Sequence, residues 1–329
     1  MLSAYGWGLV SGLWAKLLRP KDIEMLLASQ STYDFLTSLE NTPYGQDLAG
    51  VGPDTGLSEI QARLTGSFKK TYVLITGWMP EKDRMMTDML MKGLWDLANA
   101  KAVLRGRRAG LAGDAIASAL NDFGTIPKQD MIAASKAGDD EELAKAMPPG
   151  LSMHVARALT ISDNMEAERM LDREFLLSML GKCEGEIMDY VLVLIDVLNL
   201  RTLLLAKIRG FDPSDDIIPD GRHIMPSKLA ELIKTDRASF VQLLADTPYY
   251  GPMQAAMESR DDTPFEAVDI GLSRVISHEM ELASYAKPLS VNSSLSYLKK
   301  KEDEVRTLKA IAAGKFHGLP EKEIRGLIS

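Results

Sequence analysis

The chain repeats one ordered set of prolines and glycines three times, with a period of about 100 residues. The first element is a proline that opens a stretch of helix-forming residues, at Pro20, Pro127 and Pro226. Proline suits the first turn of a helix, because the N–H that it lacks would have no intrahelical partner there. The repeat therefore predicts three helices of the same kind, each beginning at a fixed place in its copy.

The second element is a proline that ends the next short amphipathic stretch and opens a turn with a following glycine. These prolines are Pro43, Pro148 and Pro248, which lie 23, 21 and 22 residues after the first element. The outer copies agree most closely, since both read Thr-Pro-Tyr, from Thr42 and from Thr247, whereas the central copy does not.

The third element is a long helical stretch that ends in a basic residue and a glycine. The stretches are 99–111, 199–211 and 307–319, and they begin 56, 51 and 59 residues after the second element. Each has a basic residue at its third position, a small residue at its eighth, a second basic residue at its ninth and a glycine at its twelfth. In chain order these residues are Lys101, Gly106, Arg107 and Gly110; Arg201, Ala206, Lys207 and Gly210; and Lys309, Gly314, Lys315 and Gly318.

A basic last turn followed by glycine is an ordinary helix end, because the cation offsets the negative end of the helix dipole. We therefore expect the bases at the ninth position to be stabilisers. The shared order and spacing of all three elements predict three similar helical domains, 1–110, 111–211 and 212–329, with the Asp- and Pro-rich stretch 211–221 as the clearest linker. The period is too long for common helical solenoids, which favours a pseudo-threefold body.

The composition predicts an all-α protein. The 45 leucines outnumber the 32 valines and isoleucines together, and residues that favour strands are scarce. One apolar stripe at helical spacing runs from Leu176 to Leu194. The apolar run from Tyr72 to Ile75 lacks the flanking alternation of a strand. The apolar residues before Trp14 read as the start of a helix, because a secretory signal would carry a basic residue ahead of them.

The charge balance and the apolar runs exclude several classes of protein. The chain has 329 residues, with 38 Lys and Arg against 46 Asp and Glu, which gives a formal charge of −8. Nucleic-acid binding needs a clustered cationic surplus, so we expect no nucleic-acid partner. No stretch has the roughly 20 apolar residues of a membrane-spanning helix. Because the one cysteine, Cys183, cannot form an internal disulfide, a reducing compartment is favoured.

The candidate metal ligands lack the spacing that metal sites need. The chain has four histidines, which are His154, His223, His278 and His317. His278 begins like a zincin motif, but Leu282 stands where the second histidine belongs. Asp212 to Asp216 resembles the start of a calcium loop, yet Ile217 stands where the loop needs glycine and His223 where it needs glutamate. We therefore expect no metal-binding residue.

The candidate catalytic and nucleotide-binding residues fail in the same way. Gly314-Lys315 lacks a phosphate-binding loop before it and Ser or Thr after it. Cys183 has no pattern of an activated nucleophile around it and reads as a passive thiol. The run 299–304, three lysines followed by three acidic residues, predicts a helix face with i,i+3 and i,i+4 ion pairs. The chain is expected to have no catalytic and no cofactor-binding residue, and thus not to be an enzyme by itself.

Three segments together resemble the C subunit of the A-type (V-type) ATP synthases of archaea and bacteria, which is similar to the d subunit of the vacuolar ATPase. They are 15–45, which ends FLTSLENTPYG; NLRTLLLAKIRG at 199–210 with the following Ile-Pro-Asp-Gly-Arg at 218–222; and 294–328, the most recognisable of the three. The chain departs from the family where Thr307 replaces asparagine, where Asp220 interrupts Pro-Gly-Gly, and where the central copy lacks Thr-Pro-Tyr.

The resemblance implies an all-helical, funnel-shaped, non-catalytic central-stalk subunit of three similar domains. Such a subunit lies at the cytoplasmic face of the cell membrane, on the ring of proteolipid subunits, and receives the shaft subunits D and F in its cavity. It rotates with them, and so couples ATP synthesis or hydrolysis to proton or sodium ion transport. It is a peripheral part of a multi-subunit complex, held by protein contacts and without direct lipid insertion.

Two other readings of the sequence stay open. One is a free-standing helical adaptor that binds a helix or a peptide in its central groove. The other is a helical hydrolase whose catalytic residues are dispersed along the chain. The resemblance does not distinguish proton from sodium ion transport or synthesis from hydrolysis, and it does not name the residues that contact the shaft or the ring.

Overall fold

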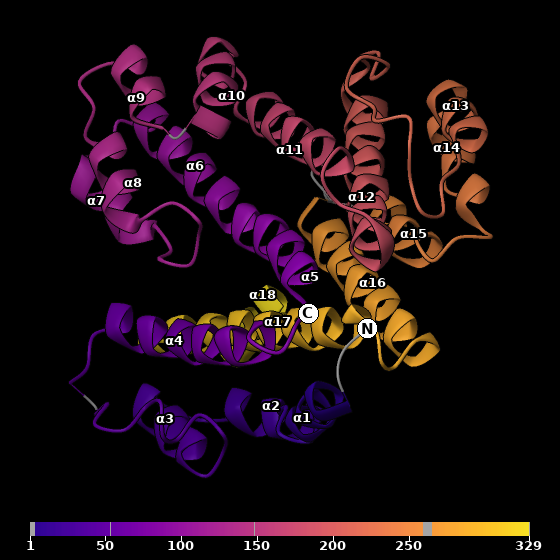
Figure 1. Ribbon diagram of the computed structural model, residues 1–329. Helices are drawn as coiled ribbons and strands as arrows, with labels where there is room; N and C mark the ends of the chain where they lie inside the picture. Colours follow the sequence, from indigo (N-terminus) through magenta and orange to yellow (C-terminus); the bar gives the residue numbers. More distant parts are fainter. Residues whose placement is uncertain (1–3, 53, 148, 259–264, 329) are drawn as a thin grey trace. The chain divides into compact units, whose positions relative to one another are not determined.

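The computed structural model describes residues 4–52, 54–147, 149–258 and 265–328, and within these ranges every regular element is a helix (Figure 1). The prediction of an all-α protein is confirmed. Pro148, the second repeat element of the central copy, lies outside the described residues. No helix in the described part of the chain is both long and apolar enough to cross a membrane.

Contacts within the chain divide it into two compact units. We call residues 1–81 and 277–329 the terminal unit, and residues 82–276 the central unit. The three predicted domains, 1–110, 111–211 and 212–329, stay a prediction.

The terminal unit is built around one long helix, α17, which packs along α4 and contacts α1 and α3 (Figure 1). Four side chains at every fourth position of α4 form a single buried stripe, Ile60, Leu64, Phe68 and Tyr72, as expected for a helix with one face in the core. The unit contains α1 (Ala4–Trp14), α2 (Pro20–Leu27), α3 (Thr32–Glu40), α4 (Leu57–Thr76), the end of α16 (Phe265–Ala286), α17 (Val291–Phe316) and α18 (Glu321–Ile328).

The central unit contains two further long helices, α6 and α12. A single π-helical turn, η1 (Asp88–Lys92), joins α5 (Glu81–Thr87) to α6 (Gly93–Arg108). The other elements are α7 (Gly113–Ala119), α8 (Lys128–Ser135), α9 (Asp140–Ala146), α10 (Pro149–Thr160), α11 (Asn164–Leu180), α12 (Gly185–Arg209), α13 (Pro226–Lys234), α14 (Arg237–Phe240), the 3-10 helix η2 (Gln242–Leu244), α15 (Tyr250–Glu258) and the start of α16.

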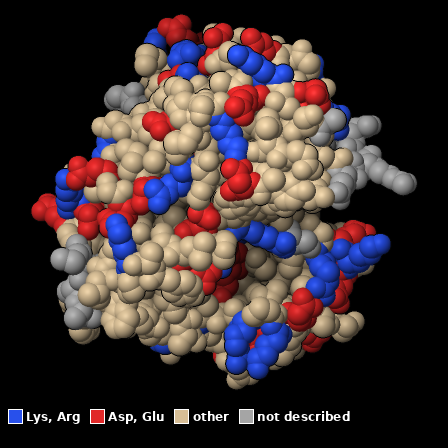
Figure 2. All heavy atoms as spheres, turned by 90° about the vertical axis from the view of Figure 1, so that its right-hand side faces the viewer, with Lys and Arg blue, Asp and Glu red and all other residues tan. Residues whose placement is uncertain are grey.

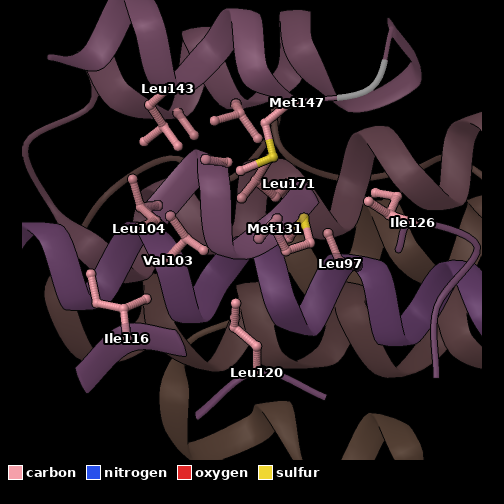
Figure 3. Close-up of a cluster of buried hydrophobic side chains, with 14 of the residues drawn as sticks. Leu97, Val103, Leu104, Ile116, Leu120, Ile126, Met131, Leu143, Met147 and Leu171 are labelled. Atoms are coloured by element: carbon pink, nitrogen blue, oxygen red, sulfur yellow. The ribbon is translucent and has the colours of Figure 1, made fainter. Parts of the chain in front are cut away.

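One hydrophobic core of the central unit gathers side chains from α6 and the helices that follow it (Figure 3). Val103 and Leu104 of α6 face Leu143 of α9 and Met147 just after it, while Leu171 reaches the same core from α11. All of these side chains are at least nine-tenths buried. Burial of each such side chain contributes about 1.5–3 kcal/mol, which holds the short helices on α6.

The proline and glycine signals mark helix ends as predicted. Pro20 and Pro226 occupy the first turn of α2 and α13. Pro127 differs slightly, since it is the N-cap residue and α8 begins at Lys128. The glycines that end the three long helices, Gly110, Gly210 and Gly318, have φ of 68°, 75° and 69°, a left-handed conformation in which glycine alone is unstrained.

The prediction of one apolar stripe from Leu176 to Leu194 is wrong. Two helices cover this stretch, because α11 ends at Leu180 and α12 begins at Gly185. Gly181 is the C-cap of α11, and Gly185 adopts a φ of 58°. Two glycines four residues apart thus end one helix and start the next, although the apolar spacing continues across them.

The glycine at the eighth position of two repeats, Gly106 and Gly314, permits close packing. A Cβ built on Gly106 would lie 2.5 Å from Cγ1 of Ile116, and one built on Gly314 would lie 2.4 Å from Cγ1 of Ile324. Both isoleucines are buried, and each lies on the short helix after the long one, α7 or α18. In both units, therefore, a glycine on the long helix lets the next short helix pack closely against it.

Replacing Gly106 or Gly314 with alanine should lower the free energy of unfolding, although alanine is the better helix former. Crowding of this kind destabilises the folded state by about 1–3 kcal/mol. The higher helix propensity of alanine stabilises the helix by about 1 kcal/mol. We expect a net loss of about 1 kcal/mol, measured by urea unfolding.

Gly66→Ala is the matched control, because Gly66 lies within α4 and nothing lies within 4 Å of its Cβ position. This variant should be more stable than the parent. The pair Gly106→Ala with Ile116→Ala should cost less than the sum of its single changes, since the smaller side chain removes the clash. Equal stabilities for Gly106→Ala and Gly66→Ala would show that the packing is loose.

Candidate functional site

The described histidines and the cysteine lie apart from any cluster of metal ligands in the described part of the chain. Among the residues that the structure describes, no three His, Cys, Asp or Glu side chains are placed to hold a metal ion. The ring of His223 packs edge-on against Tyr249. Cys183 is buried, and burial raises the pKa of its thiol, which disfavours the nucleophilic thiolate.

The charged run 299–304 forms ion pairs within α17, as predicted. Lys299 contacts Asp303 at 2.5 Å, and Lys301 contacts Glu304 at 2.9 Å. Both lysines are buried, with 6% and 4% of their surface exposed. The ammonium of Lys301 also lies 3.8 Å from the ring centre of Tyr44. These cations thus belong to the interior of the terminal unit.

A buried acidic residue recurs on each long helix, three positions before the third repeat element: Asp96, Asp196 and Glu304. Each accepts hydrogen bonds from main-chain N–H groups just before a proline helix. The Asp96 carboxylate accepts from Thr125 N and Ile126 N at 2.9 and 3.2 Å. Glu304, whose side chain is 7% exposed, accepts from Leu18 N at 2.5 Å.

Asp196 has the largest set of main-chain donors. It accepts from the N–H groups of residues 222, 223 and 224 at 3.1, 2.7 and 3.3 Å. The loop approaches so closely that a Cβ on Gly221 would lie 2.0 Å from an Asp196 oxygen. Burial raises the pKa of Asp196, while these donors act in the opposite direction. The buried carboxylate therefore holds the loop in place.

The tyrosine of each Thr-Pro-Tyr sequence donates a hydrogen bond to one of these buried acids. Tyr44 Oη lies 2.6 Å from Glu304 Oε1, and Tyr249 Oη lies 3.0 Å from Asp196 Oδ2. Burial and the Glu304 carboxylate raise the pKa of Tyr44, so its hydroxyl stays a donor. In the central copy, which lacks Thr-Pro-Tyr, the hydroxyl of Thr125 donates to Asp96 instead.

An asparagine one turn after the acid holds the next loop in two copies. Asn99 donates to Asn121 O at 2.9 Å and accepts from Asn121 N at 2.8 Å. Asn199 donates to Ile218 O at 2.8 Å and accepts from Ile218 N at 3.0 Å. Thr307 occupies this position in the third copy. The amide side chain therefore pairs with one main-chain residue in the manner of a short ladder.

The bases at the ninth position reach the C-terminal end of a neighbouring short helix. Lys207 Nζ donates to Ile233 O of α13, and Lys315 Nζ donates to Leu27 O of α2, both at 2.6 Å. Arg107 Nη1 donates to Ala137 O, just beyond α8, at 2.5 Å. Each cation thus binds a carbonyl that a helix end leaves without an intrahelical donor. Their stabilising role stays a prediction, and these contacts are its physical cause.

Two cavities lie in the described part of the central unit, and charged side chains in their walls bind other groups of the protein. The larger, about 450 Å³, is lined by Arg107, Arg108 and Lys136 among others. Arg108 donates to Ala158 O and Lys136 pairs with Asp114. The smaller, about 160 Å³, is lined by the ion pairs Lys101–Asp172 and Arg201–Asp269, which join α6 to α11 and α12 to α16. Burial raises the pKa of Asp269.

The acid, the asparagine and the ninth-position base recur among the described residues, and each of them binds main-chain groups of a neighbouring segment. A model of the ATP synthase (C/AC39) subunit family matches residues 7–327. The chain belongs to this family. The resemblance drawn from the three sequence segments is therefore confirmed.

Relatives within the ATP synthase (C/AC39) subunit family match over most of their length. The C subunit of the A-type ATP synthase of Pyrococcus abyssi is 26% identical over 97% of this chain and 88% of its own length. The C subunit of the V-type ATP synthase of Thermus thermophilus is 28% identical over 88% of this chain and 87% of its own. The A-type C subunit of Methanocaldococcus jannaschii is 25% identical over 95% of this chain and 83% of its own.

The sequence analysis missed the three buried acids, although a signal for them was present. Each acid precedes the third element by the same three residues. An acidic residue at a fixed place in an otherwise apolar helix indicates a buried carboxylate with main-chain donors, because an unpaired one would be costly.

Replacing Tyr44 or Tyr249 with phenylalanine should destabilise the protein by about 1.5–3 kcal/mol, the range for a hydrogen bond to a charged group. Each change removes a donor from a buried carboxylate. Tyr33→Phe is the control, because Tyr33 is 55% exposed. Urea unfolding at pH 7 measures all three. Stability equal to that of Tyr33→Phe would mean that another donor replaces the hydroxyl.

Replacing Lys207 or Lys315 with methionine keeps the aliphatic stem and removes the cation. We expect a loss of about 1 kcal/mol, because the carbonyl at the end of α13 or α2 loses a charged donor. Thermal unfolding measures the loss, with Lys322→Met on the exposed side of α18 as control. If stability is unchanged but assembly with partner subunits is lost, these lysines have a binding role instead of a stabilising one.

Proposed function

We propose that this chain is the non-catalytic central-stalk subunit of a rotary A/V-type ATP synthase or ATPase. The observation that carries the proposal is the family match over residues 7–327. Relatives that span nearly the same length are C subunits of A-type and V-type ATP synthases. The recurring polar residues agree with this role, since they bind main chain and build a body for mechanical connection.

In this role the subunit couples the shaft, made of subunits D and F, to the proteolipid ring. Rotation then transmits torque between ATP synthesis or hydrolysis and the transport of protons or sodium ions. The subunit is peripheral, at the cytoplasmic face of the membrane, and protein contacts hold it there. The net charge of −8 supports protein contacts over attraction to anionic lipid, which needs clustered Lys and Arg.

We also propose that three similar helical domains form the body. The recurrence of the acid, the ninth-position base and the terminal glycine on α6, α12 and α17 supports this organisation. In two copies the long helix binds residues that follow it, and in the third α17 binds residues near the N-terminus. The C-terminal long helix, α17, thus binds the first proline helix, α2.

A tagged form of the full chain should co-purify from native membranes with the catalytic and membrane-embedded subunits of a rotary ATPase. Membranes without the chain should keep ATP hydrolysis by the remaining catalytic part but lose ATP-driven ion transport, because the coupling element is absent. The isolated chain should neither hydrolyse ATP nor bind it in calorimetry. Purification without any rotary ATPase subunit, or saturable nucleotide binding by the chain alone, would contradict the proposal.

A further inference from the structure

We propose that the cavity of about 450 Å³ in the central unit binds a small polyanion, a compact molecule with two or more carboxylate or phosphate groups. We call it the anion cavity. It lies where the C-terminal ends of α6 and α8 meet the start of α9 (Figure 1). Its volume is within the range of about 300–1,000 Å³ that is typical of small-molecule sites. The inference is independent of the function proposed above, because it concerns one cavity of this chain.

Cations outnumber acids in the walls of the anion cavity. Arg107, Arg108 and Lys136 line it, and Asp140 is the one acid among its described lining residues. The whole chain has the opposite balance, with a net charge of −8. On the face that Figure 2 shows, most charged side chains lie near charges of the opposite sign. A concave wall with a cationic surplus concentrates the field of its charges and therefore attracts an anion.

The guanidinium of Arg108 brings a full positive charge that its partners do not neutralise. It donates to Ala158 O at 2.9 Å, to Asn164 Oδ1 at 2.7 Å and to Ile161 O. All three acceptors are neutral oxygens. These contacts hold the guanidinium at the wall and leave its charge for a ligand, and guanidinium groups bind carboxylates and phosphates particularly well.

Arg107 has only a weak acidic partner. Its Nη1 donates to Ala137 O at 2.5 Å, whereas its Nη2 lies 3.4 Å from Oδ1 of Asp140. The Asp140 side chain is 63% exposed, and an exposed ion pair of this length contributes little. Lys136 likewise pairs with Asp114, whose side chain is 88% exposed. The two acids nearest these cations are thus largely hydrated.

The repeat shows which of the cations the fold requires. Three long helices each bind a proline helix through the ninth-position base: α6 with α8, α12 with α13, and α17 with α2. The tenth position of the long helix is Arg108 in the first pair, but Ile208 and Phe316 in the others. The C-cap of the proline helix is Lys136 in the first pair, but threonine and alanine in the others. Two of the three cations are therefore specific to the anion cavity, and the shared packing does not need them.

The helix ends beside the cavity do not cancel this charge. The C-terminal carbonyls of α6 accept from the N–H groups of residues 110 and 111, both at 2.9 Å. Those of α8 accept from the N–H groups of residues 136 and 137, at 3.1 and 3.2 Å. These bonds satisfy groups that would otherwise attract a cation. No described lining residue is aromatic, so a nucleobase would find no ring to stack on, and a compact polyanion fits better than a nucleotide.

The test is calorimetric titration of the purified full chain with two polyanions, citrate and pyrophosphate, which distinguish a carboxylate from a phosphate ligand. At least one should bind saturably, with a dissociation constant below about 1 mM. Acetate, which carries one charge, should bind at least tenfold more weakly. Affinity for the polyanion should fall at least fivefold between about 50 and 300 mM salt, because ions screen the charges.

Two substitutions should move the affinity in opposite directions. Lys136→Gln should weaken binding at least fivefold, whereas Asp140→Asn should strengthen it at least threefold, because it removes the acid of the wall. The matched controls are Lys145→Gln and Glu141→Gln, which break a neighbouring exposed ion pair on α9 without touching the cavity. Both should bind like the parent. A bound polyanion should also raise the melting temperature of the parent more than that of Lys136→Gln.

Three outcomes would overturn the inference. The first is the absence of saturable binding of both citrate and pyrophosphate. The second is equal affinity of the parent, Lys136→Gln and Asp140→Asn, which would show that the anion binds elsewhere. The third is displacement of the bound polyanion by Mg-ATP, which would identify a nucleotide as the ligand and contradict the proposed function as well. Failure of the first two kinds leaves the proposed function standing.

Discussion

A buried carboxylate on each long helix determines where the neighbouring proline helix begins. Asp96, Asp196 and Glu304 leave water, which costs several kcal/mol unless donors surround them. The donors are main-chain N–H groups in the segment just before each proline. Without the carboxylate, these N–H groups would have no acceptor. The carboxylate and the loop thus satisfy each other. The remaining contacts of the repeat, from the asparagine to the ninth-position base, build on the register that this pairing sets.

The features that sequence analysis predicted well are local, and the ones that it missed depend on distant partners. Pro20 and Pro226 restrict their own backbone, and Gly318 takes a conformation that its neighbours cannot, so the residue type alone marks the helix end. The targets of Lys207 and Lys315 lie on other helices, and Lys315 reaches across 288 positions of sequence. Residue type shows that such a cation is present, but only the fold shows what it binds.

The central copy shows that the repeat preserves a contact and not a sequence. Tyr44 and Tyr249, from the two outer copies, donate to Glu304 and Asp196, whereas the central copy has no tyrosine after its proline. Asp96 instead accepts the hydroxyl of Thr125, from the loop that already gives it two main-chain donors. A buried carboxylate needs a certain number of donors, and any hydroxyl within reach can complete the set. This is why the central copy looks degenerate in sequence while Asp96, the acid that binds the loop before Pro127, is still paired.

A subunit proposed to carry torque needs helices that do not slide on one another, and the repeat supplies that property. On α6 the acid, the asparagine and the base span residues 96–107, about 16 Å along the helix axis. They bind three successive parts of the following chain, so sliding by one turn would break all of these hydrogen bonds together. Apolar packing alone is non-directional and resists such sliding less. The polar residues therefore stiffen the body against sliding of one helix along another.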